Sequence, residues 1–164
     1  MDLLQQYLIQ WIGSNIIAIL LLVVAIRRPK LARLLFVLLF AWASWINYTT
    51  VHNAPEEYLN YALLTPFDFM RDFINGWFKE NITSLVTLIS FGQGLIAIGL
   101  LLKGSWVKIA CIGAIVFLLA ITPLGIGSGF PCSIVAAVAI YIILKKNNLN
   151  YLLKLKTTES NLRK

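Results

Sequence analysis

The chain has 164 residues, of which 59% are hydrophobic and 13% are charged, and its formal net charge is +7. Soluble domains carry about 45–50% apolar and about 25% charged residues, and the mean hydropathy here is +0.80. These values exclude a soluble globular enzyme and a disordered chain, and they indicate a protein surrounded mostly by lipid.

Five apolar segments approach the length of about 20 residues that a helix needs to cross a bilayer. They cover residues 7–26, 31–48, 82–102, 106–124 and 131–144. Open sheets leave unsatisfied edge groups in lipid, so helices are the expected structure. The sequence predicts an all-α integral membrane bundle over residues 1–146, followed by a basic cytoplasmic tail over residues 147–164.

The first segment reads as a retained helix and not as a cleaved signal peptide. A signal peptide has positive charges before its apolar stretch. Here the only early charge is Asp2, and the basic residues Arg27, Arg28, Lys30 and Arg33 come after the stretch. Arg33 and Lys108 lie near expected helix ends, from which such side chains reach the membrane surface.

The segments that connect the helices alternate in charge. Assigning them to alternate sides puts 12 basic residues on one side and 2 on the other, with 1 and 6 acidic residues respectively. Lys and Arg collect on the cytoplasmic side of membrane proteins. We therefore expect a multi-pass protein of the bacterial inner membrane, with its N-terminus outside and its C-terminus in the cytoplasm. The basic excess then reflects orientation and indicates no nucleic-acid partner.

The outer connection, residues 49–81, is too long for a plain loop and predicts two short helices at about residues 54–79. Asn53 is the expected cap of the first, where Glu56 faces the positive end of the helix dipole. Thr65 is the expected cap of the second, with Asp68 three residues later. This second helix is amphipathic, with aromatic residues on one face and Asp68, Arg71, Asp72 and Asn75 on the other, which is typical of a helix on the membrane surface.

Polar residues near this connection suggest where a cavity would lie. Gln93 falls in the middle of the third span, and we expect it to hydrogen-bond to another helix, with a ligand contact as the alternative. The outer helices are interpreted either as a lid over a cavity or as an interfacial closure of the bundle. The candidate cavity or lid residues are Trp45, Asn47, His52, Glu56, Asp68, Arg71, Asp72 and Gln93.

Other motifs carry little chemistry. The glycine-rich run at residues 125–132 predicts a tight, partly buried outer turn. Cys111 and Cys132 are expected at different depths, hence as free thiols. The cysteine and histidine spacing predicts no metal site, and no catalytic constellation emerges.

Residues of about 31–144 resemble the DoxX-like family of small four-helix membrane proteins. The resemblance rests on Arg33 at the start of the first shared helix, on the glycine-rich second helix, and on the stretch formed by Pro55, Tyr58 and Tyr61. It extends to Lys103 at the inner turn and to the glycine-rich turn before Phe130-Pro131. The chain departs from the family in its additional N-terminal helix and in lacking a Lys just past the second span, where His52 stands nearby. The resemblance implies a four-helix core preceded by one extra helix.

Three functions follow as hypotheses. The resemblance implies an accessory or scaffold subunit that binds a partner membrane protein or lipid and has no catalysis of its own. Because some family members are linked to quinone-dependent oxidation, a quinone-linked oxidoreductase subunit is the first alternative. A transporter of lipids or small molecules is the second, although the sequence offers no repeat of the kind that transporters show.

Overall fold

The computed structural model describes residues 3–146 and Leu152, and within them the chain is helical and contains no strand. This confirms the predicted all-α class. Most of the predicted cytoplasmic tail, residues 147–164, lies outside the described residues.

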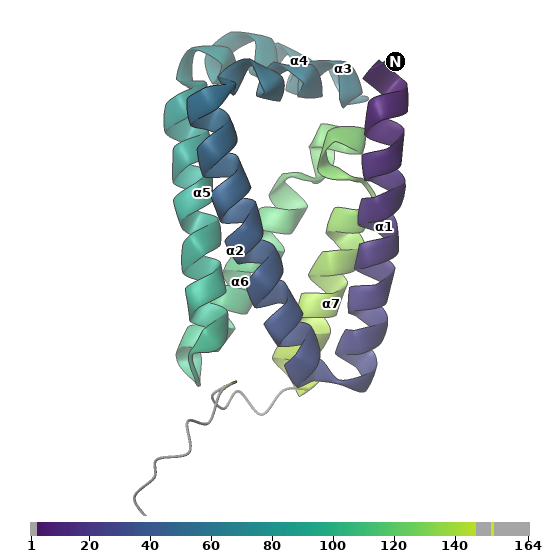
Figure 1. The fold of residues 1–164 in the computed structure, drawn as a ribbon, viewed down its shortest axis with the longest axis vertical. Helices are drawn as coiled ribbons and strands as arrows, with labels where there is room; N and C mark the ends of the chain where they lie inside the picture. The colour runs from purple at the N-terminus through teal and green to yellow at the C-terminus, as the bar shows by residue number, and fades with distance from the viewer. Residues whose placement is uncertain (1–2, 147–151, 153–164) are drawn as a thin grey trace, which may run out of the picture.

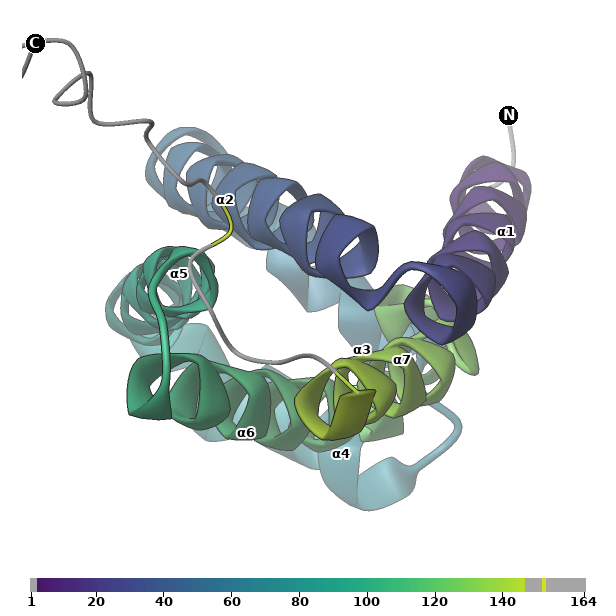
Figure 2. The same cartoon turned by 90° about the horizontal axis from the view of Figure 1, so that it is seen from below.

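Five long helices stand side by side and run alternately up and down the molecule (Figure 1). Viewed along their axes, they form a closed ring in which α1 contacts both α2 and α7 (Figure 2). The other neighbours around the ring are α2 with α5, α5 with α6, and α6 with α7. The helices are α1 (Leu3–Arg27), α2 (Pro29–Asn53), α5 (Lys79–Leu101), α6 (Ser105–Ala120) and α7 (Cys132–Lys146).

Three helical stretches are long and apolar enough to cross a membrane: Tyr7–Arg27, Pro29–Asn53 and Asp68–Leu101. A fourth is obtained if α6 and the 3-10 helix η3 (Thr122–Ser128), which bend by 80°, form one broken span. The segment predicted at 131–144 forms α7, whose 15 residues leave it shorter than these stretches. The segment predicted at 31–48 is longer than expected, because α2 continues for five residues to Asn53.

The three basic segments lie at one end of this bundle. The α1–α2 connection, the α5–α6 connection and the end of α7 are together at the bottom of Figure 1, and they carry Arg27, Arg28, Lys30, Lys103, Lys145 and Lys146. The acidic connection between α2 and α5 lies at the opposite end. The charge alternation in the sequence therefore corresponds to two oppositely charged ends of the folded chain.

The acidic connection folds into four short helical pieces that lie across the bundle's end. They are η1 (Pro55–Asn60), α3 (Tyr61–Leu64), α4 (Asp68–Phe73) and the π-helical η2 (Ile74–Phe78), which leads into α5. The two capping predictions are wrong. Asn53 is the last residue of α2, and α4 begins after Phe67. The Thr65 hydroxyl lies before the helix, where it accepts from the Phe67 N–H at 3.3 Å and donates to the carbonyl oxygen of Pro123 at 2.7 Å.

The hairpin of α6 and α7 does not reach the end formed by these pieces. With 16 and 15 residues, the two helices are about 24 and 22 Å long at a rise of about 1.5 Å per residue, against about 37 Å for α1.

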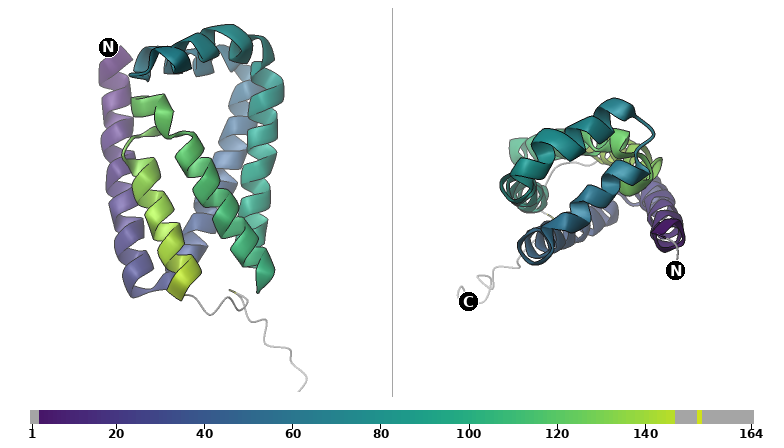
Figure 3. Two further views of the ribbon diagram at one scale, coloured as in Figure 1. Left: turned by 180° about the vertical axis from the view of Figure 1, so that it is seen from behind. Right: turned by 90° about the horizontal axis from the view of Figure 1, so that it is seen from above.

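The turn that joins α6 and α7 lies beneath α3 (Figure 3). Gly125 adopts φ +64, and a Cβ there would lie 2.9 Å from the carbonyl oxygen of Leu64. A Cβ at Gly127 would lie 2.6 Å from the Tyr61 ring, so only glycine allows this approach. The Phe130–Pro131 peptide bond is cis.

The centre of the ring is filled by small and apolar side chains. The main cluster includes Phe36, Ala97, Ala114 and Ile140, which come from four different helices. The α5–α6 contact is particularly close, because a Cβ at Gly99 would lie 2.7 Å from the Cβ of Ala110. Such small residues let membrane helices approach each other.

Arg33 is fully buried in this core, so the expectation that it reaches the membrane surface is wrong. Its Nε donates to the carbonyl oxygen of Leu100 at 2.6 Å, and its Nη2 donates to that of Leu102. The last carbonyl groups of a helix have no partner within the helix. The guanidinium, which is well suited to bridging two acceptors, therefore caps α5 from the first turns of α2.

The outer faces of the long helices are apolar. Large hydrophobic side chains on each of them are exposed, among them Ile16, Leu38, Leu88, Phe91, Leu95, Ile112, Val116 and Val138. Exposed apolar surface of this extent marks contact with a membrane or with other proteins.

Replacing Arg33 should therefore weaken the whole bundle. The Arg33→Met variant leaves two helix-terminal carbonyl groups without their charged donor. Hydrogen bonds to charged groups contribute about 1.5–3 kcal/mol each, so we expect the free energy of unfolding to fall by about 2 kcal/mol or more. The measurement is reversible SDS unfolding in mixed micelles, followed by tryptophan fluorescence. Lys108→Met, at an exposed position, is the control, and equal stabilities of the two variants would contradict the assigned role of Arg33.

Candidate functional site

Two pairs of polar side chains join α2 to α5 near the middle of α5. The Ser44 hydroxyl donates to the carbonyl oxygen of Ser90 at 2.8 Å, and the Ser90 hydroxyl donates to that of Ser44 at 2.7 Å. One turn further along each helix, Asn47 Nδ2 donates to Gln93 Oε1 at 2.8 Å. This confirms that Gln93 bonds to another helix.

Tyr58 of η1 closes this row of polar groups from the outer side. Its hydroxyl lies 3.0 Å from Asn47 Oδ1 and 3.3 Å from the Asn47 carbonyl oxygen, and it donates to them. Burial, reinforced by the neighbouring Tyr61 hydroxyl, raises the pKa of Tyr58 to about 12. The phenol therefore remains a hydrogen-bond donor throughout the physiological pH range. Since Gln93 is 4% exposed and its side-chain oxygen is already bonded, the row acts as a connection between helices.

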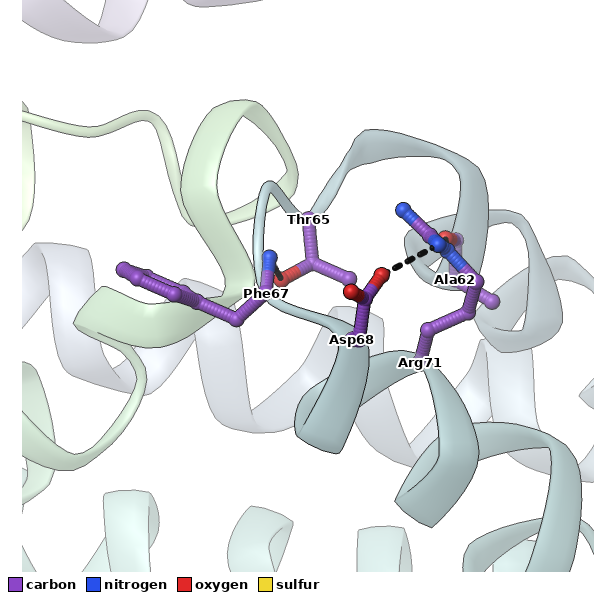
Figure 4. Close-up of polar contacts among 5 residues, drawn as sticks. All are labelled: Ala62, Thr65, Phe67, Asp68 and Arg71. Atoms are coloured by element: carbon purple, nitrogen blue, oxygen red, sulfur yellow. Dashed lines mark hydrogen bonds and ion pairs between the residues drawn. The ribbon is translucent and has the colours of Figure 1, made fainter.

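The predicted charged group of the outer helices forms a surface contact (Figure 4). Arg71 Nη1 lies 2.7 Å from Asp68 Oδ1, and Arg71 Nε donates to the carbonyl oxygen of Ala62 at 3.3 Å. The bond to Ala62 joins α4 to α3, whereas the ion pair lies within α4, and Asp68 and Asp72 are both exposed. Exposed ion pairs contribute about 0–1 kcal/mol, so this pair adds little stability.

The remaining candidate residues lie apart from these two groups. The His52 ring is exposed, stacks on Tyr48 with ring centroids 4.4 Å apart, and has its Nδ1 2.7 Å from the Tyr48 carbonyl oxygen. Glu56 lines a shallow groove of about 300 Å³ between η1 and the start of α5. Trp45 is 61% exposed on the outer face of α2. The eight candidate residues therefore divide into an internal seam, a surface ion pair and separate exposed positions.

A different feature is a groove on the side of the bundle. A groove of about 400 Å³ lies between α1 and α2, and its lining is almost wholly apolar. Four of its residues are more than half exposed: Ile17, Leu20, Leu38 and Trp42. The remaining lining residues are Leu21, Val24, Leu35 and Leu39. Sequence reasoning missed this groove, because its side chains are indistinguishable in type from those of any lipid-facing helix.

The groove exists because its two walls pack mainly against other helices. α1 packs most extensively on α7, and α2 packs most extensively on α5. Near its midpoint α1 is also held by the glycine-rich turn, where Asn15 Nδ2 donates to the carbonyl oxygen of Gly129 at 3.1 Å. The apolar faces that α1 and α2 turn toward each other are therefore left partly open.

Two further observations bear on chemistry. Cys111 and Cys132 are free. Across the part of the chain that the structure describes, no three His, Cys, Asp or Glu side chains lie close enough together to hold a metal ion.

No protein-family model, curated protein or solved structure matches the chain.

The Asn47–Gln93 bond should appear as a coupling energy between the two residues. In a double-mutant cycle of Asn47→Ala and Gln93→Ala, we expect a coupling of about 0.6–1.7 kcal/mol, the range of interhelical hydrogen bonds in membranes. The free energy of unfolding in mixed micelles is the measured quantity. The control cycle pairs Gln93→Ala with Asn81→Ala, about 18 Å further along the same helix, and should show none. Equal coupling in both cycles would argue against a direct bond.

Proposed function

We propose that this chain is a five-span protein of a bacterial inner membrane, with its N-terminus outside and its C-terminus in the cytoplasm. The proposal is supported by the exposed apolar faces of the long helices and by the concentration of basic residues at one end of the bundle. In this arrangement α6 and α7 cross as a short hairpin, and the outer pieces η1 to η2 cover it. The glycine-rich turn then lies below the outer surface, with Gly125 and Gly129 buried.

We further propose that α2, α5, α6 and α7 form a DoxX-like four-helix core and that α1 is an addition to it. The order of the connections supports this, because the long connection follows the first helix of the proposed core and the later ones are short. The polar row described above comes from α2, α5 and η1, whereas α1 packs chiefly on α7. Its addition to the core creates the groove.

The function supported best is that of an accessory protein that binds lipid through the α1–α2 groove. The single observation that carries this proposal is an apolar groove of about 400 Å³, open along its side, in a chain whose internal polar groups are largely bonded to each other. A groove that opens sideways admits a lipid chain from the bilayer. A quinone head group needs polar partners, which this lining offers only at the Trp42 ring nitrogen.

The topology can be tested with single cysteines in a background in which Cys111 and Cys132 are replaced by alanine. We expect Asp72→Cys to react with a membrane-impermeant maleimide in intact spheroplasts. Ser105→Cys and Lys146→Cys should react only after the membrane is permeabilised, because the rule for basic residues places them in the cytoplasm. Labelling of Lys146→Cys from outside would show that α7 does not cross. Labelling of Ser105→Cys from outside would reverse the orientation.

Filling the groove should reduce lipid binding. In Leu20→Trp and Leu38→Trp, a larger side chain is added from each wall in turn, at positions that are 58% and 59% exposed. We expect each variant to retain severalfold fewer lipid molecules than the unchanged protein, as counted by native mass spectrometry after stepwise delipidation. Leu88→Trp, on the outer face of α5 and 68% exposed, is the matched control. Unchanged retention in both groove variants would exclude the groove as a lipid site, whereas copurified quinone would favour the oxidoreductase alternative.

A further inference from the structure

The inner end of the groove adjoins a cluster of positive charge. α1 ends at Arg27 and α2 begins at Pro29. The basic residues at this junction of the two walls are Arg27, Arg28 and Lys30. All three are exposed. The sequence contains no acidic residue between Asp2 and Glu56, so this connection has no local negative charge.

The fourth basic residue of this connection has a different environment. Arg33 is buried and donates to carbonyl groups at the end of α5. The exposed charges of this connection are therefore those of Arg27, Arg28 and Lys30. The seven residues from 27 to 33 therefore contain one buried cation, Arg33, that stabilises the fold and three cations at the surface.

The start of α2 adds further positive potential to the cluster. Its N-cap residue, Arg28, makes no side-chain capping bond, and Pro29 occupies the first turn. The first N–H groups of a helix lack partners within the helix and carry partial positive charge. Phosphate groups bind readily where such an end coincides with basic side chains.

The spacing between the groove and the cluster matches a lipid of the inner leaflet. The innermost lining residues are Val24 on α1 and Leu35 on α2. At a rise of about 1.5 Å per residue, Val24 lies about 4.5 Å from Arg27 and Leu35 about 7.5 Å from Lys30 along the helix axes. The apolar lining continues from Val24 for about 10 Å to Ile17, on the path that an acyl chain would follow away from its head group.

We propose that the α1–α2 groove binds an anionic phospholipid of the inner leaflet. Its acyl chain lies in the groove and its phosphate contacts Arg27, Arg28 and Lys30. This inference rests on the proposed membrane topology and on the proposed lipid binding, and it adds the class of lipid and the residues that select it. A zwitterionic lipid fits the same groove but gains less from the three cations.

The test uses the full chain in detergent with equal amounts of phosphatidylglycerol and phosphatidylethanolamine, and native mass spectrometry measures the ratio of the two bound lipids. We expect the unchanged protein to prefer phosphatidylglycerol. The combined variant Arg27→Gln, Arg28→Gln, Lys30→Gln should lose that preference. Each basic residue near a membrane surface contributes about fivefold to the attraction of anionic lipid.

The control removes the same number of charges from the same end of the bundle but away from the groove. It combines Lys108→Gln, Lys145→Gln and Lys146→Gln, all at exposed positions, and it should keep the preference. Equal loss in both triple variants would overturn the site, because general attraction would then explain the preference. The unchanged protein could instead bind both lipids equally, and Leu20→Trp could reduce the binding of both. That result would refute selection of anionic lipid but would support lipid binding in the groove. Binding that neither Leu20→Trp nor Leu38→Trp reduces refutes both.

Discussion

The buried guanidinium of Arg33 is the contact on which the rest of the bundle depends. It bonds the carbonyl groups of Leu100 and Leu102 and thereby joins the beginning of α2 to the end of α5. Near the middle of α5, the Ser44–Ser90 and Asn47–Gln93 bonds also join the same two helices. An apolar interior offers no water to these groups, so each must find its partner within the protein. α2 and α5 consequently form a fixed pair against which the shorter helices pack.

This rigid pair explains the position of the groove. Since α2 is committed to α5, and α1 is held by α7 and the glycine-rich turn, the two neighbours α1 and α2 are left with facing apolar surfaces that do not fully close. The same constraint turns Arg33 inward while leaving Arg27, Arg28 and Lys30 at the surface. A single short connection thus contains both the main internal clamp and the charges proposed to select a lipid.

The sequence was informative about periodic features and uninformative about contacts between distant segments. The apolar segments and the charge alternation predicted the long helices and the two oppositely charged ends, because helix length and charge placement depend on local composition. The sequence predicts Arg33 at the membrane surface, and this prediction is wrong. Its burial depends on two carbonyl groups that are 67 and 69 residues away in the sequence. The sequence predicts Thr65 as a helix cap, but α4 begins after Phe67, and the Thr65 hydroxyl bonds both the Phe67 N–H and the distant Pro123 carbonyl group. Gln93 was placed correctly, because a lone amide in an apolar helix needs a partner. The groove was missed because leucine and isoleucine on its walls do not reveal which faces remain unpaired.

The measurement that tests this account most directly is an electron cryomicroscopy map of the protein in a nanodisc that contains phosphatidylglycerol. The account predicts five helices inside the disc, with elongated lipid density between Leu20 and Leu38 and a head group beside Arg27 and Arg28. A map in which α1 and α2 close against each other, or in which a helix of a second copy fills the space between them, would contradict it.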